Sequence, residues 1–324
     1  MEIRALPELP EGAKCTRCRT RATIRLPSHH AIVCPECFVG FFRAAVKKAM
    51  KKFGPSANQP LMVAVSGGKD SLALWDVLHE LGYVTKGLHI TLGIDDFSEA
   101  SMEAVRRFAE QRGLPWAHYS LEETFGYSVP EIKKRTRRKI CSLCGLLKRQ
   151  MLNRLTIREG FQALAVGHNL DDEAGRLMGN IMRNRYQYLD KQSPFLPSTH
   201  PRLPARLKPL YRLAAAEIRQ YCASKSIIPV EGKCPLSRGA TSHIFKEALN
   251  FLENKMPGTK RDFLFTYLRR NKASFDALPF VSCKECGEPA FDGQCSVCRL
   301  KEQLMEDKKE ADDKKISSQV LSEQ

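Results

Sequence analysis

No apolar run in this 324-residue chain approaches the roughly 20 residues that a transmembrane helix needs. The segment from Met1 to Lys14 also lacks a charged region followed by an apolar one, which is the pattern of a secretory signal. From these two absences we expect a cytosolic protein without a membrane partner. The sequence shows no internal repeat beyond a pair of cysteine-rich segments, one near each end.

Acidic residues are scarce relative to basic ones: 36 Asp and Glu stand against 52 Lys and Arg, which gives a formal net charge of +16. The basic residues are clustered, at Lys47, Lys48, Lys51 and Lys52 and again in residues 133–139. A chain this basic favours a polyanionic partner. A solvated basic face is the alternative, but the second run adjoins a cysteine motif, which favours nucleic acid.

The glycine turn at residues 66–71 fits neither G-x-x-x-x-G-K-[ST] nor G-x-G-x-x-G, so it is not a Walker P-loop. The apolar residues 61–65 predict a buried strand before the turn, and periodic apolar residues from Leu72 onward predict a helix after it. The turn would place several backbone N–H groups and the positive end of a helix dipole at one point, which suits a phosphate. An ordinary strand-to-helix turn is the alternative. The candidate phosphate-binding residues are Ser66, Gly67, Gly68, Lys69, Asp70 and Ser71.

The cysteine-rich segments each contain two Cys-x-x-Cys pairs. In a cytosolic chain such pairs indicate metal sites rather than disulfides. Four thiolates are what tetrahedral structural zinc requires, and zinc would supply folding energy to segments this small. Free or disulfide-bonded cysteines are the alternative. The first set is Cys15, Cys18, Cys34 and Cys37, and the second is Cys283, Cys286, Cys295 and Cys298.

Cys141 and Cys144 form a further Cys-x-x-Cys pair without a second pair nearby. Two thiols remain: Cys222 in a helical stretch with apolar neighbours, and Cys234 before a proline in a loop. A Cys-Pro loop is a frequent context of an iron–sulfur ligand, whereas a helical cysteine is often a small buried apolar residue. Spacing alone leaves four interpretations open: a [4Fe–4S] cluster with one open iron, a third zinc site, a redox pair, or inert cysteines.

Strand and helix patterns alternate along the middle of the chain. A turn and a strand are expected at residues 82–90, and a buried strand at 161–166. This alternation predicts an α/β fold with a doubly wound parallel sheet, in which ligands bind at the carboxyl ends of the strands. The turn at 66–71, His89 and residues 167–172 follow such strand ends, so we expect them to converge.

Together these motifs resemble the TtuA-type tRNA 2-thiolation enzymes, which are PP-loop ATP pyrophosphatases with archaeal and eukaryotic relatives that thiolate the wobble uridine. The likeness extends over nearly the whole chain. The 2-thiocytidine enzymes share the loop and the cluster cysteines but lack the flanking zinc fingers, so they fit less well. The likeness is carried by residues 65–71, 87–90, 141–145, 167–173 and 231–235.

The resemblance implies that residues 66–71 form a PP-loop, which grips the β- and γ-phosphates of ATP while a substrate attacks the α-phosphate. It also implies that Cys141, Cys144 and Cys234 hold an oxygen-sensitive [4Fe–4S] cluster whose fourth iron binds sulfur. The substrate would be a tRNA uridine, which is adenylated at its 2-oxygen before sulfur replaces AMP. A homodimer is implied as well, as is a ubiquitin-like sulfur carrier with a C-terminal thiocarboxylate.

The same resemblance suggests which residues surround the nucleotide. His89 and Ile90 would meet the adenine and the ribose, and Gly167 and His168 would lie beside the phosphates. A satisfied core histidine is the alternative for His89.

Two residues are candidates for catalysis. Asp172 would hold Mg²⁺ or move a proton, and a helix cap is its alternative. Lys148 lies one helical turn past Cys144 and would stabilise charge on the activated uridine or on sulfur. Simple phosphate binding is the alternative for Lys148.

We expect four parts: residues 1–52, a zinc finger with a basic helix; 53–278, the PP-loop catalytic domain with the iron–sulfur site; 279–300, a second zinc finger; and 301–324, a charged tail. The proline-containing residues 183–209 are expected to form a long loop. The predicted function is ATP-dependent synthesis of 2-thiouridine in tRNA, at position 54 in preference to wobble position 34 or to 2-thiocytidine. A non-catalytic zinc-finger RNA-binding protein and a small-molecule ATP-dependent ligase are the alternatives from other classes.

Overall fold

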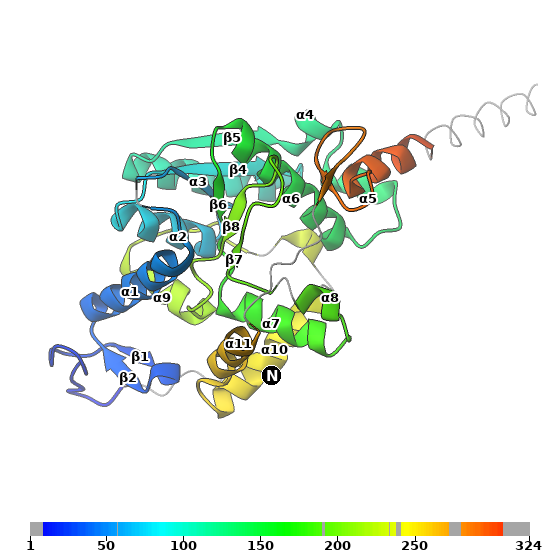
Figure 1. The fold of residues 1–324 in the computed structure, drawn as a ribbon. Helices are drawn as coiled ribbons and strands as arrows, with labels where there is room; N and C mark the ends of the chain where they lie inside the picture. The colour runs from blue at the N-terminus through cyan, green and yellow to red at the C-terminus, as the bar shows by residue number, and fades with distance from the viewer. Residues whose placement is uncertain are drawn as a thin grey trace, which may run out of the picture.

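A six-stranded sheet forms the centre of the computed structural model, which describes residues 9–56, 58–189, 192–232, 234–237, 241–271 and 280–306 (Figure 1). The strand order is β5-β4-β3-β6-β8-β7. Neighbouring strands are parallel except for β7, which runs antiparallel to β8 at one edge. The α/β class is therefore confirmed, with one antiparallel edge strand added. The strands are β3 (Leu61–Ala64), β4 (Thr85–Thr91), β5 (Trp116–Ser120), β6 (Ala163–Ala165), β7 (Phe195–Leu196) and β8 (Ala205–Leu207).

The strand β3 lies in the interior of the sheet because its side chains are apolar on both faces. Leu61, Met62 and Val63 are completely buried. Leu61 and Val63 pack into the core on one face, whereas Met62 packs into the core on the other. A parallel strand that is covered on both faces needs an uninterrupted apolar run, which explains why the sequence signal for this strand is strong.

Helices cover both faces of the sheet. The core that contains Leu61 and Val63 lies beneath α1 (Pro35–Phe53), α2 (Lys69–Glu80), α3 (Asp95–Arg112) and α9 (Ala215–Ser224). The core that contains Met62 lies beneath α5 (Val129–Lys134) and α6 (Ile140–Arg158), and α4 (Leu121–Phe125) follows β5 at its margin. A third core joins α7 (Leu170–Ile181), α10 (Thr241–Lys255) and α11 (Thr259–Arg270).

The N-terminal segment shares the central core. Its strands β1 (Ile24–Leu26) and β2 (Ala31–Val33) form a hairpin around η1 (Pro27–His29). Phe38, Phe42 and Val46 on one face of α1 are completely buried. The ring of Phe42 stacks on that of Tyr221 in α9, with the centroids 3.9 Å apart. The four lysines near the end of α1 remain exposed, as a nucleic-acid contact would require.

The C-terminal segment docks on the other face of the sheet. Its strands β9 (Val281–Ser282) and β10 (Pro289–Ala290) pair, and residues 296–306 are helical. Cys283 and Leu300 join the core beneath α6. The side-chain amide of Gln150 in α6 donates to Sγ of Cys295 at 3.5 Å. Residues 307–324 of the predicted tail lie outside the described residues, and the domain boundaries at 52, 278 and 300 stay predictions.

Residues 183–209 do not form one long loop, contrary to the sequence prediction. The described part of this stretch contains α8 (Tyr186–Leu189), β7 and β8. Strands of two and three residues are too short to show a period in the sequence, and β8 is fixed by long-range pairing such as Leu164 with Arg206. Among the described helices, none has both the length and the apolar character that crossing a bilayer demands.

Candidate active site and metal centres

The glycine turn at residues 66–71 connects β3 to α2, as the sequence predicts. Gly68 is the N-cap of α2 and offers no side chain to the first N–H groups of the helix, so these amides can bind an anion. Ser71 Oγ donates to the carbonyl of Gly68 at 2.9 Å and accepts from the N–H of Ser66 at 3.1 Å. Lys69 Nζ lies 2.6 Å from Oδ2 of Asp70. Side chains of the turn thus stabilise it from within.

The backbone conformation of Gly67 and its contacts with two neighbouring segments restrict this position to glycine. Its φ is +75°, in the left-handed region that favours glycine. A Cβ at this position would lie 2.5 Å from the carbonyl oxygen of Ser101 in α3. The carbonyl of Gly67 accepts from the N–H of Val230 at 2.8 Å. The position therefore requires glycine for two independent reasons.

The loop after β6 packs directly on this turn. A Cβ on Gly167 would lie 3.0 Å from the carbonyl carbon of Asp70 and from the nitrogen of Ser71. Asn169 is the N-cap of α7, and its Nδ2 donates to Oδ1 of Asp70 at 2.9 Å. The side chain of His168, between them, is exposed. The expected convergence of the strand ends is therefore present.

His89 lies near the carboxyl end of β4 and is only 2% exposed. Its Nδ1 lies 2.8 Å from the carbonyl oxygen of Val65. Because a carbonyl only accepts, Nδ1 carries the proton and Nε2 is an acceptor. Burial, with the charges of His118 and Lys148, lowers the pKa of His89 to about 4, so the ring is neutral. Within the described residues Nε2 has no hydrogen-bond partner, and it is free to accept from a ligand. Its neighbour Ile90 is buried.

Asp172 helps to cap α7 as the third residue of a capping box whose N-cap is Asn169, in line with the helix-cap alternative given for it above. Its Oδ2 accepts from the N–H of Asn169 at 3.0 Å, and Asn169 Oδ1 accepts from the N–H of Asp172 at 3.1 Å. Its Oδ1 also pairs with Lys246 of α10. Burial opposes ionisation, but Lys246 and His168 lower the pKa of Asp172. The carboxylate is therefore charged, and its role toward Mg²⁺ stays a prediction.

A buried ion pair, which the sequence analysis missed, lies next to Asp172. Lys208 Nζ is 2.8 Å from Oε2 of Glu173, and the two side chains are 2% and 4% exposed. Burial lowers the pKa of Lys208 to about 8 despite the opposing charge of Glu173. The partners are 35 residues apart in the sequence, so no local pattern could indicate the pair.

Cys141 and Cys144 lie in the first turns of α6, and Cys234 immediately precedes η2 (Pro235–Ser237), which packs on α6. Cys141 Sγ lies 3.7 Å from the carbonyl oxygen of Leu236. Burial raises the pKa of Cys144; Lys148 opposes this shift, and the neighbouring Cys234 and Cys141 add to it. The three cysteines thus lie on α6 and on the segment that packs against it, and a metal site formed by their thiols stays a prediction.

Cys222 lies elsewhere. It is 5% exposed in α9 and belongs to the core on the other face of the sheet from Cys144 and Cys234. Its S–H donates to the carbonyl of Lys69 at 3.5 Å. This placement supports Cys234, rather than Cys222, as the partner of the Cys-x-x-Cys pair.

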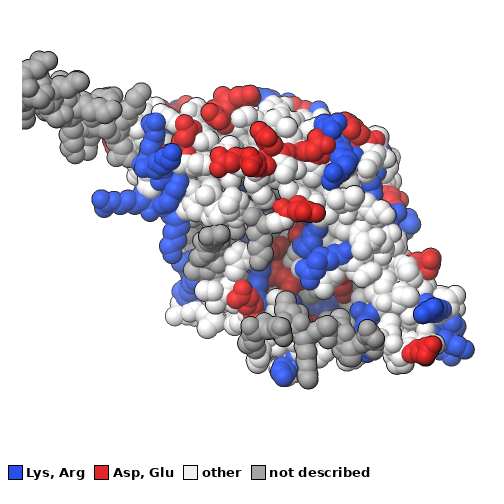
Figure 2. Space-filling view, turned by 180° about the vertical axis from the view of Figure 1, so that it is seen from behind, with Lys and Arg blue, Asp and Glu red and all other residues white. Residues whose placement is uncertain are grey.

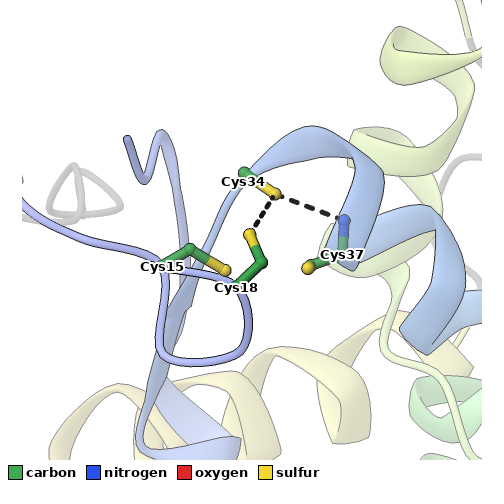
Figure 3. Close-up of side chains that lie close together, drawn as sticks. All are labelled: Cys15, Cys18, Cys34 and Cys37. Carbon is green, nitrogen blue, oxygen red and sulfur yellow. Dashed lines mark hydrogen bonds between the residues drawn. The ribbon is translucent and has the colours of Figure 1, made fainter. Parts of the chain in front are cut away.

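The first four-cysteine set is assembled, with the sulfurs of Cys15, Cys18, Cys34 and Cys37 directed toward one another (Figure 3). All four sulfurs lie within 4.8 Å of one another. Burial opposes ionisation of Cys15, but backbone N–H groups, including that of Arg17, lower its pKa to about 6. Contacts with Cys18 and Cys34 raise the pKa of Cys37 to about 12. Four sulfurs that cannot all ionise without a cation fit tetrahedral zinc.

The second set, Cys283, Cys286, Cys295 and Cys298, repeats this arrangement within 4.8 Å. The N–H groups of Cys295 and Cys298 point at the sulfurs of Cys283 and Cys295 at 3.3 and 3.4 Å. Despite burial, backbone N–H groups lower the pKa of Cys283 to about 6. The donor set again fits zinc, and occupancy of both sites stays a prediction.

Comparison with known proteins agrees with this geometry. Residues 42–232 match the family model of the PP-loop domain. The tRNA-5-methyluridine(54) 2-sulfurtransferase of Thermus thermophilus is 40% identical over 88% of this chain and 90% of its own. The protein of the same description from Pyrococcus horikoshii is 36% identical over 89% and 93%. Cytoplasmic tRNA 2-thiolation protein 1 of Chlamydomonas reinhardtii is 30% identical over 90% and 84%.

A solved structure gives the same result. The U34-tRNA thiolase NcsA from Methanococcus maripaludis, determined with its [4Fe–4S] cluster, superposes with a TM-score of 0.78 at 26% identity. The match covers 90% of this chain and 96% of that one. With a PP-loop that joins β3 to α2 and relatives that match 88% to 90% of its length, the chain belongs to the PP-loop family of tRNA 2-thiolation sulfurtransferases.

Proposed function

We propose that this chain uses ATP to convert a tRNA uridine at position 54 into its 2-thio form. The placement of Lys148 carries the proposal. Its charge acts both on His89, beside the PP-loop, and on Cys144 of the three-cysteine site. A base bound near Lys148 would therefore meet the nucleotide on one side and the thiols on the other.

ATP would bind with its triphosphate on the PP-loop. The uncapped amides and the dipole of α2 stabilise the charge of pyrophosphate as it leaves. His89 Nε2 would accept a hydrogen bond from the adenosine, and Ile90 would contact it through apolar surface. Gly167 and His168 line the adjoining loop, and Asp172 would offer a carboxylate oxygen to Mg²⁺.

The reaction needs ATP because the uridine 2-oxygen is a poor leaving group. Attack of this oxygen on the α-phosphate releases pyrophosphate and leaves an AMP ester, from which sulfur can displace AMP. Lys148, with three N–H donors and a positive charge, would stabilise negative charge on the 2-oxygen and the adjoining ring nitrogen during both steps. Asp172 would accept the N3 proton that the uridine loses when its 2-oxygen attacks the α-phosphate, so Lys148 keeps its charge.

Cys141, Cys144 and Cys234 would hold a [4Fe–4S] cluster, because three thiolates leave one iron without a protein ligand. When bound, this group would supply a place for sulfur close to C2 of the uridine. The buried Leu143 and Leu147 on α6 would shield the site from water.

Position 54 is favoured over position 34 by the relatives. Those described for position 54 are 40% and 36% identical, whereas the U34 thiolase is 26% identical. The two zinc fingers would hold the body of the tRNA, assisted by the exposed lysines of α1. A thiocarboxylated ubiquitin-like carrier, a homodimer and a cytosolic location complete the proposal and rest on the family resemblance.

Mass spectrometry of tRNA nucleosides from a strain that lacks the gene tests this function. Loss of the 2-thio derivative of 5-methyluridine supports position 54. Loss of wobble 2-thiouridine or of 2-thiocytidine would instead identify that nucleotide as the target. The purified protein should release pyrophosphate only with tRNA. An unchanged nucleoside profile together with ATP turnover in the absence of RNA would contradict the proposal and favour a small-molecule ligase.

A further inference from the structure

Three arginines from three different elements come together beside the three-cysteine site. Arg149 is on α6, Arg176 on α7 and Arg206 on β8. Arg206 Nη2 donates to Oδ1 of Asn153, one turn beyond Arg149 on α6, at 2.6 Å. Arg176 pairs with Glu173, whose other partner, Lys208, follows Arg206 by two residues. In line with this proximity, burial and the charges of Arg149 and Arg176 lower the pKa of Arg206 to about 10.

The positive charge of this cluster is not balanced by the residues that the structure describes. Arg176 binds both oxygens of Glu173 at 2.6 and 2.7 Å, but Glu173 is shared with Lys208. Arg206 has a neutral amide as its partner. Arg149 makes no ion pair with any described residue, and no carboxylate contributes to the shift of its pKa. Because guanidinium groups stay charged at neutral pH, the cluster would be stabilised by an external anion.

The cluster is accessible to such an anion. Arg149 and Arg176 are exposed, and Arg206 is half-buried. Partial removal from water nonetheless lowers the pKa of Arg149. A Cβ on Gly145 would lie 3.1 Å from Arg149 Nη1, so the guanidinium lies back along α6 toward Cys144. On the face opposite to that of Figure 1, Figure 2 shows a hollow in which basic and acidic side chains meet.

We propose that Arg149, Arg176 and Arg206 bind the tRNA backbone phosphate beside the nucleotide that is being modified, an inference that rests on the proposed function. The planar fork of arginine matches the paired oxygens of a phosphodiester. The triphosphate of ATP has separate donors in the PP-loop. A target base must leave its stack to reach a buried site, and a phosphate held next to Cys144 would keep it there.

The charge of the cluster favours RNA over a protein terminus. RNA presents a phosphate on each side of the target nucleotide, whereas a sulfur carrier would present one carboxylate at its end. Three guanidinium groups, of which only Arg176 pairs with a described carboxylate, match the former better. The free C-terminus of a carrier is kept as a separate outcome of the test.

Arg149→Gln is the test variant. Arg149 makes no ion pair with a described residue, so the substitution removes no such interaction from the folded protein. Binding of unmodified tRNA to full-length protein without the iron–sulfur cluster is measured across a salt series, so that no activity is needed. We expect the slope of log affinity against log salt to become shallower by about 0.7–0.9, and affinity to fall about sixfold near 0.1 M salt. Arg149→Lys should keep most of the slope, because it keeps the charge.

Arg154→Gln is the matched control, since Arg154 is exposed on the same helix but interacts with Glu288 instead. It removes the same charge and should leave the slope nearly unchanged. Zinc content and circular dichroism confirm that each variant is folded. A wild-type protein that does not bind tRNA contradicts the proposed function itself.

If the wild type binds tRNA and Arg149→Gln binds it with the same affinity and slope, the inference is wrong. Weaker ATP binding with unchanged tRNA binding would assign the arginines to the nucleotide. Weaker binding of a peptide with a free C-terminal carboxylate, again with unchanged tRNA binding, would assign them to a carrier. Either result overturns the assignment to the RNA backbone.

Discussion

The side-chain amide of Asn169 donates to Oδ1 of Asp70 at 2.9 Å and so joins two loops that are 99 residues apart. The other carboxylate oxygen of Asp70 is bound by Lys69 at 2.6 Å. Because Asn169 is also the N-cap of α7, one residue fixes both the start of that helix and the side chain of the PP-loop acid. The shape of the phosphate site therefore depends on the loop after β6.

Replacing Asn169 by aspartate tests this dependence. Asn169→Asp keeps an N-cap oxygen but sets a second carboxylate against Asp70, so the PP-loop should open while α7 stays capped. We expect ATP affinity to fall by about tenfold, which corresponds to about 1.4 kcal/mol, with a small change in the free energy of unfolding. Isothermal titration with ATP and urea unfolding measure the two effects. Equal ATP affinity in the variant would show that the tether has no role in nucleotide binding.

Gly67→Ala should weaken nucleotide binding while the rest of the protein stays folded. A left-handed φ costs a non-glycine residue about 1–2 kcal/mol, and the Cβ would also meet the carbonyl of Ser101. The turn must shift to relieve the contact, so tRNA-dependent pyrophosphate release should fall by at least about tenfold. Binding of tRNA should be unchanged, because the basic surface is untouched.

The control for this variant is Gly82→Ala. Gly82 has a similar φ, +82°, but nothing lies within 4 Å of the position that a Cβ would take there. The Gly82→Ala variant should keep its activity, and its free energy of unfolding should fall by the same conformational cost, about 1–2 kcal/mol. If the two variants lose activity equally, the close approach to Ser101 is not what positions the PP-loop.

The features that the sequence predicted well are those whose signal is local. The apolar run before the PP-loop is continuous because β3 is buried on both faces, and the Cys-x-x-Cys pairs carry their spacing within four residues. The predicted strand at 161–166 is observed as Ala163–Ala165, since only these positions pair with β8. Each of these signals could be found without knowledge of the partner segment.

The features that the sequence did not predict depend on contacts between distant segments. The strands β7 and β8 are too short to show a period. The strand β8 exists because β6 offers an edge to pair with, and β7 exists because β8 offers the next edge. The convergence of the two loops was expected, but no local pattern indicates the hydrogen bond between Asn169 and Asp70. Arg206 is an arginine between Ala205 and Leu207 in a short strand, and only the fold brings it to α6, where it binds Asn153 one turn beyond Arg149.

The three cysteines near α6 should be separable from Cys222 by a parallel set of alanine variants. Cys141→Ala, Cys144→Ala and Cys234→Ala should each abolish thiolation and reduce bound iron, while zinc content and folding are kept. Cys222→Ala should retain iron and activity and lose about 1 kcal/mol of stability, because it leaves a small cavity beneath Lys69. Anaerobic reconstitution, metal analysis and nucleoside analysis provide the measurements. Full activity in any one of the first three, or an inactive Cys222→Ala, would mean that the third ligand is wrongly assigned.

The buried pair of Glu173 and Lys208 makes stability depend on pH on the acid side. Burial alone would raise the pKa of Glu173, but Lys208 and Arg176 outweigh it and lower that pKa to about 2 from the ordinary value of 4.5. Between pH 4.5 and about 2 the carboxyl group of Glu173 is protonated in the unfolded chain but still ionised in the folded protein. The stabilising contribution is therefore complete above pH 4.5 and is lost as the pH falls toward about 2.

Glu173→Gln should abolish this acid-side dependence and destabilise the protein at neutral pH. It leaves the ammonium of Lys208, which is 2% exposed, without a carboxylate, and breaking such a pair costs about 3–5 kcal/mol. The double variant Glu173→Gln with Lys208→Met removes the orphaned charge and should recover most of the loss. Urea unfolding over a pH series measures both effects. A double variant as unstable as Glu173→Gln alone would show that Glu173 acts through Arg176 and Gln192, to which it also binds, rather than through Lys208.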